Sequence, residues 1–157
     1  MYEKKIMDQC VNSCLEGMQK GEGGPFGAAV VKDNKIIAVA HNTVVKSNDP
    51  TAHGEMNAIR EACKVLNTFD LSGCELYTTS EPCPMCMSAI IWANIKKVYF
   101  GCTVEDAQDI GFRDEHILKF LRSGCSEKNI LDLEAVDKCE CEKAFDYWRN
   151  DIKKIEY

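Results

Sequence analysis

Short apolar runs that suit β-strands alternate along this chain with segments in which apolar side chains recur at helical spacing. The strand candidates are rich in β-branched and aromatic residues and lie at 27–32, 35–41, 74–80 and 96–102. Asp33-Asn34 joins the first two runs, which predicts a hairpin with a two-residue turn. Helices between strands require a sheet that is covered on both faces, so the predicted fold class is α/β, a three-layer α/β/α sandwich.

Helical patterns fill the segments between and after these strands. They are predicted at residues 2–19, 52–66, 84–93, 104–109, 114–122 and 141–152. Thr51 or Asp49 is the expected cap of the second helix, and Pro84 suits the first turn of the third. A chain of 157 residues fits one domain with a real hydrophobic core, so we expect 1–157 to form a single domain.

Composition limits the environment in which the protein works. No apolar run approaches the roughly 20 residues of a membrane span, and no apolar stretch follows the charged N-terminus, so we expect neither a membrane anchor nor a signal peptide. The net charge of −6 disfavours a nucleic acid as the main partner. Ten cysteines in a chain without a signal peptide indicate reduced thiols, and hence a cytoplasmic protein. Cys10 and Cys14 lie at helical spacing, and we expect their helix face to be buried in the core.

His53, Cys83 and Cys86 form the candidate metal site. Imidazole and thiolate are the ligands that zinc prefers, and two cysteines three residues apart at a helix start can point the same way. His53 and Cys83 would each begin a helix that follows a strand. If those strands are adjacent and parallel, the helix starts meet at one end of the sheet, where ligands of α/β proteins usually bind.

The number of ligands separates a structural site from a catalytic one. A structural zinc normally has four protein ligands, whereas this motif has three, so a fourth position is left for water. Glu55, two residues after His53, is a candidate general acid/base for that water. The order H-G-E at 53–55 and P-C-P-M-C at 82–86 matches the signature of zinc-dependent nucleobase deaminases, H-x-E followed by P-C-x-x-C.

A longer set of motifs resembles the cytidine deaminase superfamily, and within it the bacterial guanine deaminases. The segments that carry this resemblance are "GGPFGAAVVKDNKIIAVAHN", "NDPTAHGEMNAIR", "FDLSGCELYTTSEPCPMCMSAIIWANIKKVYFGCT" and "DIGFRDE". The first three are shared in outline with tRNA adenosine deaminases, whereas the fourth and the aromatic C-terminal tail are similar to guanine deaminases. Gly54 departs from the family, which more often has Ala there, but it leaves both functional side chains in place.

The resemblance implies a central sheet of about five strands, one zinc ion per subunit and hydrolysis of guanine to xanthine and ammonia. Zinc-bound hydroxide would attack C2 of the base, Glu55 would move the protons, and the backbone N–H of Cys83 would lie near the reacting oxygen. The residues that the resemblance places around the purine base are Phe26, Asn42, Trp92, Asp114 and Tyr157. Four of them have a simpler structural alternative: Phe26 and Trp92 as packing residues, Asn42 as a polar cap of a strand, and Asp114 as a helix N-cap.

The resemblance also implies a homodimer in which residues 124–157 are exchanged with a neighbouring subunit and Tyr157 closes the partner's pocket. The aromatic side chains Phe145, Tyr147 and Trp148 suit a docking element, although docking on the same subunit explains them equally well.

Two other kinds of function are consistent with the motifs. One is deamination of adenosine in tRNA, or of a cytosine-type base, because pocket shape sets the substrate of these enzymes. The other is a zinc-stabilised binding module without catalysis, which would have a fourth protein ligand such as Cys102 or Cys74.

Overall fold

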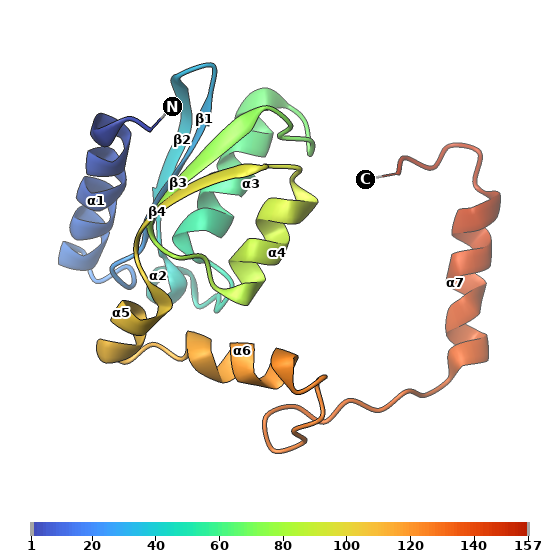
Figure 1. The fold of residues 1–157 in the computed structure, drawn as a ribbon. Helices are drawn as coiled ribbons and strands as arrows, with labels where there is room; N and C mark the ends of the chain where they lie inside the picture. The colour runs from blue at the N-terminus through green and yellow to red at the C-terminus, as the bar shows by residue number, and fades with distance from the viewer. Residues whose placement is uncertain (1, 157) are drawn as a thin grey trace. The chain divides into compact units, whose positions relative to one another are not determined.

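The computed structural model describes residues 2–156, which form two compact units that divide after Glu115 (Figure 1). The strands are β1 (Gly27–Lys32), β2 (Lys35–His41), β3 (Cys74–Ser80) and β4 (Lys97–Cys102). The helices are α1 (Lys4–Gln19), α2 (Val44–Ser47), α3 (Gly54–Leu66), α4 (Pro84–Trp92), α5 (Val104–Asp109), α6 (Asp114–Arg122) and α7 (Lys138–Asn150). The strands and the larger helices agree with the predicted segments to within a few residues.

The strands form one mixed sheet in the order β2-β1-β3-β4. β1 pairs antiparallel with β2 and with β3, and β3 pairs parallel with β4. Asp33 and Asn34 both have positive φ, 49° and 59°, as the predicted two-residue hairpin turn requires. The described residues contribute four strands to this sheet, where the family resemblance implied about five.

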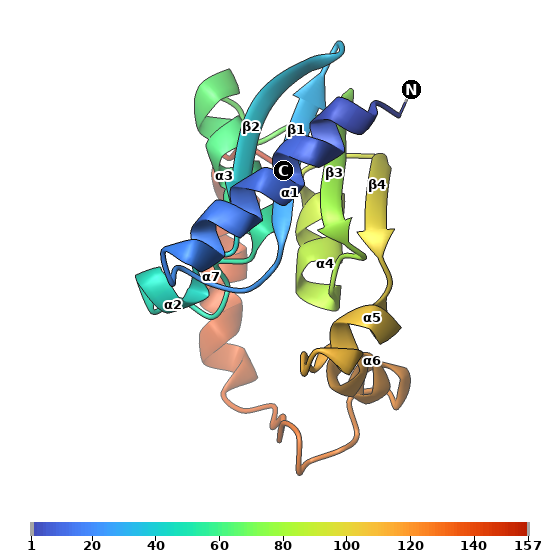
Figure 2. The ribbon, with the colours of Figure 1, turned by 90° about the vertical axis from the view of Figure 1, so that its left-hand side faces the viewer.

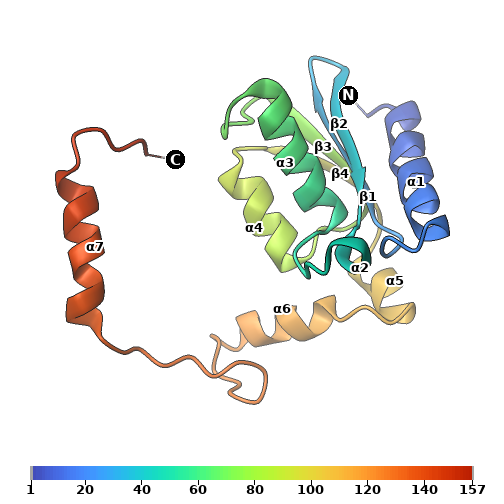
Figure 3. The ribbon, with the colours of Figure 1, turned by 180° about the vertical axis from the view of Figure 1, so that it is seen from behind.

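Helices cover the sheet on both faces, as the alternating pattern predicted. On one face α1 packs Ile6 and Cys10 against Tyr77 of β3, and Figure 2 shows this helix lying across the sheet. On the other face α3 and α4 enclose a second core around Leu76, and Figure 3 shows both helices on that side. The three-layer sandwich is therefore confirmed, and so is the burial of Cys10 and Cys14.

The direction of the strands brings the starts of α3 and α4 to the same end of the sheet. β2 precedes α3 and β3 precedes α4, and both strands run antiparallel to β1. They are consequently parallel to each other but separated by β1, so of the two conditions, parallel and adjacent strands, the first is met and the second is not. The prediction that the helix starts meet is correct, because it depends on strand direction rather than on strand pairing.

The cap predicted for α3 was wrong. His53 occupies the N-cap position with extended backbone angles, φ −69° and ψ 159°. The Asp49 carboxylate instead accepts hydrogen bonds from the N–H and hydroxyl of Thr51, at 2.8 and 2.7 Å, and forms a separate turn before the helix. The N-cap position of α3 is therefore occupied by a metal-ligand candidate, His53, whose side chain makes no capping hydrogen bond.

The C-terminal unit contains most of α6 and all of α7. Phe120 is the buried residue of α6, and α7 has no buried residue in the single chain. Across residues 2–156, no helix combines the length and the apolar character that crossing a membrane requires.

Candidate metal centre and active site

His53, Cys83 and Cys86 meet at the end of the sheet where α3 and α4 begin. Nδ1 of His53 lies 3.6 Å from the sulfur of Cys83 and 3.6 Å from that of Cys86. The three ligand atoms all lie within 4.8 Å of one another, and within residues 2–156 this is the group of His, Cys, Asp and Glu side chains with metal-binding geometry. Both cysteines are buried.

These distances fit a zinc ion. Zinc binds sulfur at about 2.3 Å and imidazole nitrogen at about 2.0 Å, so two such ligands at a tetrahedral angle lie about 3.5 Å apart. The observed separations of 3.6 Å match this value. With three ligands in the described part of the chain, a tetrahedral ion keeps one position open.

Local sequence explains why the ligands converge. Cys83 is the N-cap of α4 and Pro84 follows in the first turn, so this helix starts at the metal site. Hydrogen bonding from Cys86, and then from His53, lowers the pKa of Cys83 and favours its thiolate. Gly54 lets the backbone of β1 approach α3, because a Cβ there would lie 2.8 Å from the carbonyl oxygen of Phe26. The sequence did not reveal this close contact between Gly54 and Phe26.

Glu55 is buried beside this group, with 5% of its surface exposed. Burial raises the pKa of its carboxyl group, and the negative charge of Cys83 adds to this rise. A buried carboxyl group whose neutral form is favoured in this way is suited to general acid/base chemistry.

A small cavity of about 30 Å³ joins the metal group to the predicted base-binding residues. Its lining residues are Phe26, Asn42, His53, Glu55, Glu81, Cys83, Phe112 and Asp114. Asn42 is buried at the end of β2, and its side-chain oxygen accepts from the backbone N–H of Gly24 at 3.3 Å and of Val44 at 3.1 Å. The amide oxygen is thus engaged by the backbone, which leaves the NH₂ group as the part of Asn42 that a ligand can meet.

Asp114 also faces this cavity. It is the first residue of α6, and burial raises the pKa of its carboxyl group, with a further contribution from the charge of Cys83. Asp114 therefore lies both in the cavity wall, where it could contact a ligand, and in the first turn of α6.

Sequence reasoning missed two lining residues, Glu81 and Phe112. Phe112 packs edge-on against Phe26, with ring centroids 4.6 Å apart and planes at 82°. A carboxylate oxygen of Glu81 accepts from the N–H of Val104 at 3.4 Å. Glu81 lies two residues before Cys83, and Phe112 lies in the DIGFRDE segment two residues before Asp114, so in both cases the neighbouring motif was an available signal.

Other predicted residues do not join the site in the single chain. Trp92 ends α4 with 67% of its surface exposed and is not part of the cavity wall, because eight helical residues after Pro84 span about 12 Å. Cys74 and Cys102 do not belong to the metal-binding group found in the described residues. Tyr157 lies outside the described residues.

Comparison with known proteins decides the family. Residues 1–102 match the family model "Cytidine and deoxycytidylate deaminase zinc-binding region". The chain belongs to this deaminase family. The zinc cofactor expected from the motif is in accord with the family and with the His53, Cys83 and Cys86 group.

Individual relatives show which members of the deaminase family this chain resembles over its whole length. A guanine deaminase of Bacillus subtilis is 45% identical over 157 residues, which cover all of both chains. The X-ray structure of guanine deaminase from B. subtilis superposes with a TM-score of 0.91 at 43% identity, covering 100% of this chain and 99% of that one. A tRNA-specific adenosine deaminase of Aquifex aeolicus is 56% identical over 101 residues, which cover 64% of this chain and 66% of that protein. The resemblance to bacterial guanine deaminases is thus confirmed over the whole length.

Proposed function

We propose that this protein hydrolyses guanine to xanthine and ammonia. The observation that carries the proposal is the cavity that joins the metal group and Glu55 to Asn42 and Asp114. Asp114 lies beyond the segment shared with the wider deaminase family, and the full-length similarity to a guanine deaminase includes it.

Glu55 is the proposed proton carrier. His53, Cys83 and Cys86 would hold the zinc ion, which would supply the Lewis acidity that makes water a nucleophile at neutral pH. Glu55 accepts a proton from the attacking water and passes it to N3 of the ring. The water oxygen bonds to C2, and Glu55 then takes the second proton from the new C2 hydroxyl and delivers it to the amine. The C2–N bond breaks, ammonia leaves, and C2 keeps the oxygen as a carbonyl group. One carboxyl group can act first as base and then as acid because the transfers are sequential.

Asn42, Asp114 and Phe26 are the proposed base-binding residues. The NH₂ group of Asn42 donates to an acceptor atom of the purine, because its oxygen is already bonded to the backbone. The Asp114 carboxylate accepts from the N–H groups of guanine, and such charge-assisted bonds are stronger than neutral ones. Phe26 provides an apolar surface for the ring.

The cavity must open when the base enters. Its volume of about 30 Å³ has room for water, which needs about 10–15 Å³ by this measure, but not for a purine. Phe112 is the most exposed side chain of the lining, and we expect it to move aside.

Charge argues against tRNA as the substrate. Residues 124–157 contain six basic and nine acidic side chains, whereas a segment that binds RNA is expected to be basic. The tRNA-specific relative from A. aeolicus also covers 64% of the chain rather than all of it.

Ammonia release tests the proposal directly. Zinc-loaded protein is given guanine, adenine or cytosine in parallel, with a tRNA that contains the target adenosine as a fourth substrate. We expect release from guanine alone. Release from adenosine in tRNA and not from guanine would overturn the assignment while leaving the metal site intact.

The C-terminal segment, residues 124–157, is the proposed dimerisation element, exchanged between two copies of the chain. In support, α7 has no buried residue, and apolar side chains of this segment are exposed, among them Phe145 at 69%, Tyr147 at 76% and Trp148 at 43%. Exposed apolar surface of this kind marks a protein interface. By family resemblance Tyr157 closes the pocket of the partner subunit.

Two variants test dimerisation and pocket closure separately. We expect Trp148→Glu to convert a dimer into a monomer in light scattering, and Tyr157→Ala to remain dimeric while kcat/KM for guanine falls. A wild-type monomer would contradict the exchange.

The proposed location is the cytoplasm, and the proposed role is the breakdown of guanine. All ten cysteines are free thiols in the structure, as a reducing compartment favours.

A further inference from the structure

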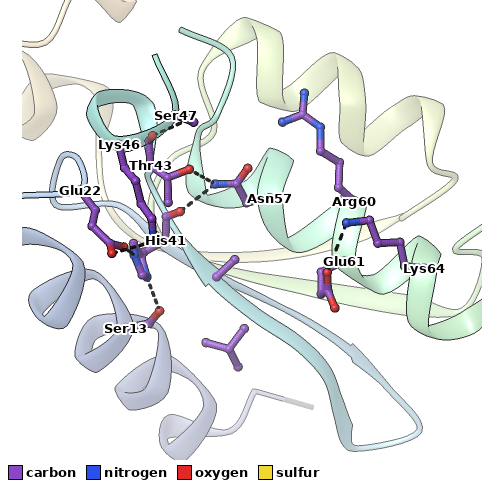
Figure 4. A pocket seen from close by; sticks show the side chains of 12 residues that line it. Ser13, Glu22, His41, Thr43, Lys46, Ser47, Asn57, Arg60, Glu61 and Lys64 are labelled. Carbon is purple, nitrogen blue, oxygen red and sulfur yellow. Dashed lines mark hydrogen bonds and ion pairs between the residues drawn. The ribbon is translucent and has the colours of Figure 1, made fainter. Parts of the chain in front are cut away.

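A second and larger cavity, of about 810 Å³, is lined by residues of α1, β2, α2 and α3 (Figure 4), among them His41 and Thr43, the two chain neighbours of Asn42. Asn57 of α3 reaches into its wall and points toward residues 41–43, as Figure 4 shows. Asn57 is four residues after His53 and two after Glu55, so it belongs to the same helix turn as the catalytic group.

The side-chain NH₂ group of Asn57 makes three contacts. It donates to the carbonyl oxygen of His41 and to the hydroxyl of Thr43, both at 2.9 Å. It also lies 3.3 Å from the carbonyl oxygen of Ala52, the residue before His53. A single amide therefore ties helix α3 to both chain neighbours of Asn42 and to the neighbour of a metal ligand.

These contacts matter because the position of Asn42 depends on its backbone. Its oxygen already accepts from Gly24 and Val44, which sets the direction of its NH₂ group. Gly23 allows this packing, since a Cβ there would lie 2.3 Å from the backbone oxygen of Asn42. A shift of residues 41–43 would move the donor group of Asn42 relative to His53 and Glu55.

The His41 ring holds the same strand end from the opposite side. Its Nε2 lies 2.7 Å from the Glu22 carboxylate and its Nδ1 lies 2.9 Å from the Ser13 hydroxyl. These bonds connect the strand end to α1 and to the loop after it, whereas Asn57 connects it to the helix of the metal site. Asn57 is thus a side-chain link between the base-binding and the metal-binding halves, beside the backbone hydrogen bond that the N–H of Thr43 donates to the carbonyl oxygen of Ala52 at 2.9 Å.

We propose that Asn57 is a positioning residue, which sets the distance between the base-binding amide of Asn42 and the group formed by His53 and Glu55. This inference rests on the proposed function, because it assigns Asn57 a role in binding guanine. Asn57 contacts neither the base nor the metal, and it acts through Asn42.

Asn57→Asp tests the role of the donors, because it keeps the shape of the side chain and replaces the NH₂ group with an acceptor that faces two carbonyl oxygens. We expect KM for guanine to rise about tenfold, as for the loss of one or two hydrogen bonds, while kcat changes less than about threefold. Zinc content should stay at one per chain. Glu61→Ala is the matched control, since it lies one turn further along α3 in the same cavity wall, and it should leave KM unchanged.

A double-mutant cycle with Asn42→Ala shows whether Asn57 acts through Asn42. We expect Asn57→Asp to raise KM less than about twofold in the Asn42→Ala background. If Asn57→Asp does not fold, Thr43→Ala takes its place in the double-mutant cycle with Asn42→Ala, because it removes one hydrogen-bond acceptor of the Asn57 amide. An equal rise in both backgrounds, no rise in either, or loss of zinc would overturn the proposal. Wild-type protein that releases no ammonia from guanine would instead overturn the proposed function.

Discussion

Replacing Glu55 by Gln separates proton transfer from every other property of the site. Gln has nearly the shape of Glu, but its amide neither accepts nor delivers a proton at neutral pH. Glu55 is 5% exposed, so bulk water has little access to replace it as proton carrier. It does not belong to the metal-binding group in the described residues, so the substitution leaves the ligands in place.

The size of the effect follows from this geometry. General acid/base catalysis contributes about 10²–10⁴-fold to a rate. Because the proposed mechanism assigns two proton transfers to Glu55, which is shielded from water, we expect kcat to fall by about 10⁴, or about 5.4 kcal/mol of activation free energy. The free energy of unfolding should stay the same or rise. Burial raises the pKa of this carboxyl group, which means that the folded protein disfavours its charged form, and neutral Gln carries no such penalty.

Three measurements on one preparation check the reasoning: ammonia release from guanine, zinc content by mass spectrometry, and thermal melting. Glu81→Gln is the matched control, because it changes another carboxylate of the same cavity wall, and its kcat should stay within about tenfold of the wild type. The assignment of Glu55 would be refuted by a variant that keeps more than about one hundredth of the activity. A zinc-free Glu55→Gln protein would equally refute it, since Glu55 would then be a ligand.

Three further substitutions probe the metal, the base and the fold. Cys83→Ser should lower zinc content well below one per chain in metal analysis, whereas Cys102→Ser, outside the metal-binding group, should retain it. Asp114→Asn should lower kcat/KM for guanine by about 10–100-fold, the range expected for a hydrogen bond to a charged group, and an unchanged value would mean that Asp114 serves α6 alone. Bonds from Lys46 and then His41 lower the pKa of Glu22 to about 2, so Glu22 stabilises the fold above its unfolded pKa near 4.5 and loses this effect as the pH falls toward 2. The thermal midpoint of wild-type protein should therefore exceed that of Glu22→Gln at pH 6 and approach it at low pH; a gap independent of pH would contradict this origin.

Local patterns in the sequence identified most of the secondary structure and the chemistry of the metal site. The two-residue turn at Asp33-Asn34, the helix that starts at Pro84 and the buried face of α1 each follow from short-range preferences of the chain. The metal ligands could also be predicted, because a histidine and two cysteines at the starts of helices form a typical zinc ligand set.

Three-dimensional packing decided what no local pattern contains. β1 lies between β2 and β3 because of long-range strand pairing, and this placed the two metal-binding helix starts together without adjacent strands. Phe112 and Glu81 joined the cavity wall, and Trp92 did not, because the wall depends on where separate segments meet.

The sequence by itself therefore determined an α/β deaminase with a zinc ligand set and a candidate proton carrier, since each of these is encoded in residue type and spacing. Only the tertiary structure decided which way Asn42 presents its amide, that Asp114 faces the metal group, and that Asn57 ties the two halves of the site together. The physical reason is that hydrogen bonds and cavities form between residues far apart in the chain, where spacing along the sequence carries no information about distance.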